Sequence, residues 1–138
     1  MTHGLMVVNA FLRTNKFDDI YQTLLHSAQE CGMELSVLTN AELCTRVDEL
    51  PTAAYDFVLF WDKDVALATR LEQRGFAVFN SAQSILKCDD KALTYLTLRQ
   101  ANLPTPQTIL APKTFPAIGY PSLDFVDEAA QSWAFRSC

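Results

Sequence analysis

The sequence has few of the residues that metal sites and nucleophilic catalysis require. Its 138 residues include two histidines and four cysteines, with no Cys-x-x-Cys pair and no histidine at a metal-ligand spacing. We therefore expect no metal site, no disulfide framework and no Ser-His or Cys-His catalytic pair. His26 lies off the apolar stripe of its predicted helix, so we expect it on the surface. The cysteines are expected to be scattered and reduced: Cys31, Cys44, Cys88 and Cys138.

Charge and hydropathy argue against two further classes of protein. The net charge is −5 and no basic run occurs, so a nucleic-acid partner is not expected. No segment approaches the roughly 20 apolar residues that a membrane helix needs. The first apolar run is also too short for a signal peptide. We therefore expect no membrane partner and a cytoplasmic location.

Short, continuous apolar runs are the clearest structural signal in the chain. They predict four strands, at Leu5–Val8, Leu35–Leu38, Tyr55–Trp61 and Phe76–Phe79. Amphipathic helices are predicted between them, at 18–31 and at 65–73 with Asp64 as the N-terminal cap. Strands that are apolar on both faces and alternate with helices favour a parallel sheet covered on each side. The predicted fold class is therefore α/β, a Rossmann-like three-layer parallel sheet.

Polar residues follow three of the predicted strands. Ligands of doubly wound sheets bind beyond the carboxyl ends of the strands, so this edge is the expected location of a site. The candidates there are Asn9, Arg13, Lys16, Trp61, Asp62, Lys63, Asn80 and Ser81.

The pattern changes after the fourth strand. A short helix is predicted at 81–86, a longer one at 91–101, a strand at 108–110 and an amphipathic stretch at 123–130. Two prolines make Leu103–Pro106 a stiff extended connector. We interpret this change as passage from one domain, residues 1–88, into the start of another, residues 89–138.

Phosphate binding has one candidate residue, although the common phosphate-binding loops are missing. The loop directly after the first predicted strand contains no glycine, so the Gly-x-Gly-x-x-Gly dinucleotide-binding fingerprint is absent. No Gly-x4-Gly-Lys-Ser/Thr loop occurs either. Lys91, however, stands in the first turn of a predicted helix, where the helix end already carries partial positive charge. Together with free backbone N–H groups it could receive a phosphate. The alternative is a solvated lysine supported by the acids beside it.

Acidic pairs at 18–19, 62/64 and 89–90 are first interpreted as helix caps. A functional alternative is that Asp62 is a phospho-acceptor at a strand end, as in bacterial receiver domains. Receivers carry an acidic pair directly after the first strand, where this chain has Asn9-Ala10-Phe11. A receiver-like signalling module is therefore the second hypothesis.

The stretch VFNSAQSILKCDDKALTYLTLRQANLPTPQTILAP resembles the junction in ATP-grasp ligases, where a pre-ATP-grasp domain meets the nucleotide-binding domain. The resemblance is strong from Phe76 to Ala111 and moderate before it. Within that family it is similar to the glutamate-ligase-like carboxylate-amine ligases. The matching positions are Asn80, Asp90, Lys91, Thr94, Leu96, Pro104, Pro106 and Thr108.

The resemblance implies that Lys91 reaches an ATP phosphate and that Asn9, Arg13 and Asn80 lie on the substrate side. The family's reaction uses ATP and magnesium to activate a small-molecule or peptide carboxylate as an acyl-phosphate, which an amine then attacks. Neither ATP nor magnesium is expected to bind to this fragment alone. The implied partner is the missing ATP-grasp domain, and exposed apolar surface beyond Pro104 makes a homodimer possible.

The C-terminal residues carry a further expectation. The family needs about another domain, ~150 to 200 residues, beyond this point. Plausible codons for Gln131–Cys138 are CAG AGC TGG GCT TTC CGC TCG TGC, and a shifted frame reads Glu-Leu-Gly-Phe-Pro-Leu-Val, the family's continuation. We therefore expect that a frameshift truncates the ATP-grasp domain. Designed truncation and a free-standing interaction domain descended from the ligase are the alternatives.

Overall fold

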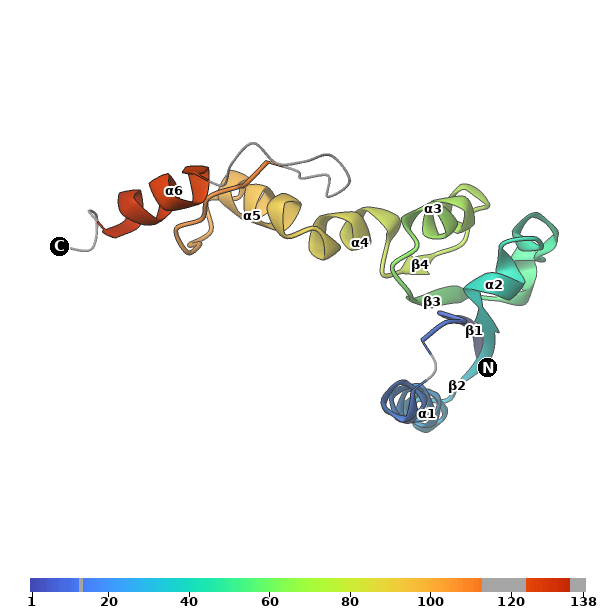
Figure 1. Cartoon of the computed structure of the whole chain (residues 1–138). Coiled ribbons are helices and arrows are strands. Elements are labelled where there is room, and N and C mark those ends of the chain that lie inside the picture. The colour runs from blue at the N-terminus through green and yellow to red at the C-terminus, as the bar shows by residue number, and fades with distance from the viewer. Residues whose placement is uncertain (13, 113–123, 135–138) are drawn as a thin grey trace. The chain divides into compact units, whose positions relative to one another are not determined.

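Four strands form one parallel sheet in the first part of the chain (Figure 1). The computed structural model describes residues 1–12, 14–112 and 124–134. The strands are β1 Thr2–Val8, β2 Met33–Thr39, β3 Phe57–Trp61 and β4 Val78–Phe79. Each lies on a predicted apolar run, which confirms the α/β class with a parallel sheet. The strand order is β2-β1-β3-β4, so the chain moves outward from β1 in both directions.

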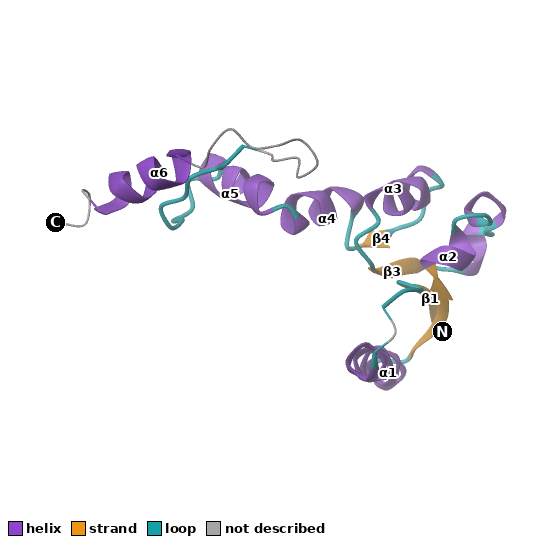
Figure 2. Cartoon of the chain, viewed as in Figure 1, coloured by secondary structure: helices purple, strands orange, loops and turns teal. Residues whose placement is uncertain are grey.

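Helices connect the strands (Figure 2), and the long ones begin and end close to their predicted positions. The helix α3 spans Val65–Gln73 as predicted, because the Asp64 carboxylate accepts a hydrogen bond of 2.9 Å from the backbone N–H of Leu67. The helix α1, Asn15–Glu30, ends before Gly32, whose φ of 71° suits a residue without a side chain. The remaining elements of this part are α2 Asn40–Leu43, α4 Ala82–Asp89 and two short 3-10 helices, Val47–Glu49 and Thr52–Ala54.

The two faces of the sheet are covered to different extents. On one face, side chains from β1, β3 and β4 pack with α3, α4 and the segment around α2 into the main core. The opposite face carries Met6 and Val8, and α1 packs beside β2 (Figure 1). Val37 and Phe79 lie on this second face and remain 42% and 59% exposed. Helices on both faces are compatible with a Rossmann-like layout, although the α1 face is partly open.

The predicted buried stripe of α1 is confirmed. Ala28 is buried, and the other apolar members of the stripe are half-buried: Phe17, Ile20, Tyr21, Leu24 and Leu25. His26 lies on the exposed side, as expected, and its Nε2 atom is 3.5 Å from a Glu30 carboxylate oxygen.

The chain divides into two compact units, Met1–Thr94 and Tyr95–Cys138, and the boundary lies within α5, Lys91–Gln100. The second unit also contains α6, Asp124–Ala134. The predicted strand at 108–110 is wrong, since these residues form no strand and the described residues offer them no strand to pair with. Apolar exposure beyond Pro104 is confirmed for Ile109, Leu110 and Val126, at 45%, 43% and 48%.

Candidate functional site

A cleft opens in the first unit at the carboxyl ends of the strands. It has a volume of about 560 Å³, which lies in the range of small-molecule sites. The strand that follows β1 in the chain, β2, lies on one side of β1, and the next strand, β3, lies on its other side. The strand order therefore reverses direction at β1, and α/β sheets bind ligands at the carboxyl ends of the strands beside such a point. The lining residues follow β1, β3 and β4 or open α1: Asn9, Phe11, Leu12, Phe17, Phe60, Trp61, Asp62, Lys63 and Asn80.

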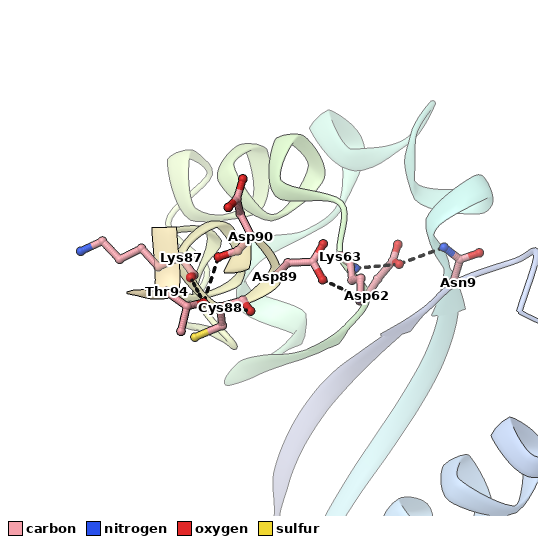
Figure 3. Close-up of polar contacts among 8 residues, drawn as sticks. All are labelled: Asn9, Asp62, Lys63, Lys87, Cys88, Asp89, Asp90 and Thr94. Atoms are coloured by element: carbon pink, nitrogen blue, oxygen red, sulfur yellow. Dashed lines mark hydrogen bonds and ion pairs between the residues drawn. The ribbon is translucent and has the colours of Figure 1, made fainter. Parts of the chain in front are cut away.

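The half-buried carboxylate of Asp62 holds three strand ends together. Its Oδ1 atom accepts hydrogen bonds from the Asn9 side-chain amide at 2.9 Å and from the Lys63 backbone N–H at 2.8 Å. Its Oδ2 atom accepts a bond of 2.9 Å from the side-chain amide of Asn40, which follows β2. Figure 3 shows the Asn9–Asp62 contact. With three N–H donors around it, the carboxylate has a structural role at this edge.

The same two asparagines position the loop after β1. The Asn9 side-chain oxygen accepts a bond of 2.8 Å from the Phe11 backbone N–H. The Asn40 side-chain oxygen accepts one of 2.9 Å from the Ala10 backbone N–H. Each amide therefore uses both its donor and its acceptor, and the loop that carries Phe11 is tied to two neighbouring strand ends.

Apolar side chains form the walls of the cleft and remain open to solvent. Phe11 is 85% exposed, Leu12 is 42% exposed and Trp61 is 38% exposed. Phe17, at the start of α1, completes this group and is half-buried. Large apolar side chains gathered around a concave surface are typical of binding sites.

The sequence-predicted site residues are brought together in part. Asn9, Trp61, Asp62, Lys63 and Asn80 all line the cleft. Lys16 does not line it, and Ser81 caps α4, accepting a bond of 3.2 Å from the Ser84 backbone N–H. Arg13 lies outside the described residues.

Sequence reasoning named Trp61 but not the other apolar walls, and it did not name Asn40. Asn40 follows β2 directly, so the rule that drew attention to the other strand ends applies to it equally. For Phe11 and Leu12 the signal was two large apolar residues in a loop that is otherwise polar.

A tight corner joins α4 to α5 at Asp90-Lys91, within the segment that resembles the ATP-grasp junction. The Asp90 carboxylate accepts hydrogen bonds from the backbone N–H groups of Ala92 and Leu93, at 2.8 and 3.0 Å. The Thr94 hydroxyl lies 2.7 Å from the Lys87 carbonyl oxygen and 2.9 Å from that of Asp90 (Figure 3). Two positions of the motif therefore satisfy backbone groups at the facing helix ends.

Lys91 occupies the same corner, and its side chain is exposed. In the part of the chain that the structure describes, no carboxylate forms an ion pair with it. Two of the N–H groups expected to be free at this helix end are already bonded to Asp90. A phosphate at this corner would therefore depend on the Lys91 ammonium more than on those backbone donors.

One ion pair connects the corner with the cleft. The Lys63 ammonium, from the cleft lining, contacts the Asp89 carboxylate at the end of α4 (Figure 3). Both side chains are substantially exposed, at 77% and 45%. Asp89 stands two residues before Lys91, so the pair lies between the corner and the strand-end site, within one unit.

Two kinds of feature are absent from the described residues. No group of three or more histidine, cysteine, aspartate or glutamate side chains is arranged there to hold a metal ion. None of the helices in residues 1–12, 14–112 and 124–134 has the length and apolar character needed to cross a bilayer.

Comparison with known proteins finds relatives in two mycoplasmas. The chain is 31% identical to the "Uncharacterized protein MG012 homolog" of Mycoplasma pneumoniae over 129 residues, which is 88% of this chain and 44% of the relative. It is 33% identical to "Uncharacterized protein MG012" of Mycoplasma genitalium over 119 residues, 83% of this chain and 41% of the relative. The chain thus spans less than half the length of these relatives. No family model matches it.

Proposed function

We propose that the chain is the first part of an ATP-dependent carboxylate-amine ligase. In this proposal residues 1–88 form a pre-ATP-grasp domain, residues 89–138 begin the ATP-grasp domain, and Lys91 contacts an ATP phosphate. The cleft at the strand ends serves the substrate side, with Asn9 and Asn80 in its lining. ATP, magnesium and the remaining domain belong to the complete enzyme, which activates an acid as an acyl-phosphate before the amine attacks.

The observation that carries the proposal is the division of roles within the Asp-Lys-x-x-Thr segment. Asp90 caps α5 and Thr94 satisfies carbonyl groups at the end of α4, so both have structural reasons to be present. Lys91 has no such reason among the described residues, yet it stands at a helix end where positive charge is unfavourable. A side chain that breaks a local rule without a structural benefit is a candidate for function.

The length of the relatives supports the same proposal. The chain spans 44% and 41% of the two mycoplasma proteins, which leaves room in a complete protein for another domain. The receiver-like alternative stays a prediction. The three N–H donors bonded to Asp62 give it no support, since a phospho-acceptor needs its carboxylate oxygens for the incoming phosphoryl group.

The coding DNA and ATP turnover test the proposal in turn. We expect the alternative frame after Gln131 to encode a glycine-rich lid, a second lysine and a magnesium-binding Glu/Asn set. In a protein that carries this chain together with the proposed ATP-grasp domain, Lys91→Ala should lower kcat/KM for ATP about 10- to 100-fold, the loss expected for one charge-assisted contact. Lys87→Ala is the matched control, because Lys87 is an exposed lysine four residues away, and it should change kcat/KM less than about twofold.

Two outcomes would contradict parts of the proposal. A downstream frame without the ATP-grasp residues would rule out the frameshift and leave designed truncation or a free-standing interaction domain. An equal effect of the Lys91 and Lys87 substitutions on ATP turnover would mean that the corner lysine has no special contact with the nucleotide.

A further inference from the structure

The apolar walls of the cleft face a carboxylate that retains acceptor capacity. An ionised carboxylate offers about four acceptor positions. In Asp62 three are occupied, two on Oδ1 by Asn9 and Lys63 and one on Oδ2 by Asn40. One position on Oδ2 therefore remains for a donor that enters the cleft.

Among the described residues, the charge nearest this position is that of the Asp62 carboxylate itself. Lys63 is the one cation among the described lining residues, and its ammonium is paired with Asp89. That pair is neutral as a whole, whereas Asp62 is bonded to two neutral amides and a backbone N–H. Among the described residues the Lys63 charge is thus engaged outside the cleft, whereas the Asp62 charge meets no cation, so a cationic group of a ligand is favoured beside it and a carboxylate is disfavoured.

The apolar walls of the cleft indicate what a ligand would contain besides the cationic donor group. Phe11, Phe17 and Trp61 present aromatic surface to the cleft, and Leu12 adds an aliphatic contact. Aromatic rings pack well against one another, and their faces also attract a nearby ammonium. A single molecule with a flat ring and a short ammonium-bearing arm would satisfy both the walls and the free acceptor position.

We propose that the cleft binds a small molecule with an aromatic ring and an ammonium group, the ring against Phe11 and Trp61 and the ammonium donating to Asp62 Oδ2. Its further role as the amine reactant rests on the proposed ligase function, whereas its binding does not. The cleft would then select the amine substrate class before ATP is involved.

Ligand fluorescence titration of the 138-residue chain tests this assignment. The sequence has two tryptophans, so a Trp133→Phe background leaves Trp61 as the only tryptophan reporter. The probes are phenethylamine, 3-phenylpropionate, which has the same ring but an anionic end, and butylamine, which has the charge without the ring. We expect saturable quenching or enhancement with phenethylamine, and binding at least about tenfold weaker for each of the other two.

Matched variants locate the binding. Phe11→Ala should weaken phenethylamine binding about three- to tenfold, and because Phe11 is 85% exposed the fold should survive the change. Phe79→Ala is the control, since Phe79 is also an exposed aromatic residue near the sheet edge but does not line the cleft. It should leave the dissociation constant unchanged within about twofold.

Each result has a defined meaning. Absence of saturable phenethylamine binding, equal binding of 3-phenylpropionate, or equal effects of Phe11→Ala and Phe79→Ala would overturn the assignment. Saturable binding by a protein that fails the ATP-turnover test would support the ligand class and refute only the reactant role, so the two proposals fail separately.

Discussion

Removal of the Asp62 carboxylate is the most informative perturbation of this structure. The carboxylate accepts three hydrogen bonds from groups that follow β1, β2 and β3. Asp62→Ala leaves the side-chain amides of Asn9 and Asn40 without their acceptor at a half-buried position. It should therefore loosen the edge of the sheet and not merely change its charge.

The magnitude follows from the number of bonds lost. A hydrogen bond contributes about 1 kcal/mol net, and more when one partner is charged. Water can replace the acceptor of the Lys63 backbone N–H more readily than that of the two amides, so we expect Asp62→Ala to lower the free energy of unfolding by about 2–3 kcal/mol. Asp62→Asn keeps one acceptor but turns an N–H₂ group toward another amide donor, and should cost about 1–2 kcal/mol.

Urea unfolding followed by Trp61 fluorescence in the Trp133→Phe background measures both losses in the first unit. The slope with denaturant should stay constant, so that the shift of the midpoint reports stability. Asp19→Ala is the control, because it removes an exposed carboxylate from α1 and should change the free energy of unfolding by less than about 0.5 kcal/mol. If Asp62→Ala behaved like this control, the carboxylate would not hold the strand ends together and the reasoning would be refuted.

Two further substitutions test the packing that positions the site. Gly4→Ala places a methyl group 2.5 Å from Phe57 Cζ and 2.6 Å from Leu35 Cδ2; we expect a loss of about 1–3 kcal/mol, and an unchanged melting temperature would show that the two side chains yield freely. Thr94→Val removes the hydroxyl that bonds the Lys87 carbonyl and should cost about 1 kcal/mol and speed amide hydrogen exchange around the corner, whereas Thr94→Ser should behave like the parent protein.

The sequence predicted those helices and strands whose ends are determined by residues within or next to the element itself. The helix α3 was predicted at its observed bounds because Asp64 caps it and Gly75, with a φ of 93°, follows its end. The four strands were predicted because each is a short apolar run in a sheet buried on one face and partly on the other. The apparent strand at 108–110 failed because a strand exists only with a partner, and that information is not local.

The sheet topology predicted which residues gather at the candidate site, but not how they contact one another. Asn9, Asp62 and Asn80 were expected at one edge because parallel strands end on the same side of a sheet, and all three line the cleft. The contacts within that edge were not predictable. Which oxygen of Asp62 each amide uses depends on strand order and loop geometry, and the sequence pattern carries neither.

The position of Lys91 relative to the cleft depends on packing more than on charge. The Lys63–Asp89 pair is exposed, and exposed ion pairs contribute at most about 1 kcal/mol. The helix α4 is held much more firmly, since Ala82 and Ile85 are buried in the core and the Ala82 backbone N–H donates to a Glu72 carboxylate oxygen at 2.9 Å.

The support behind Lys91 is therefore rigid at both ends of α4. Core packing anchors the start of the helix, and the bonds of Asp90 and Thr94 close the corner at its end. Lys91, which forms no ion pair among the described residues, therefore projects from a backbone that is held on both sides, so a ligand bound there would have to order its side chain but not its helix.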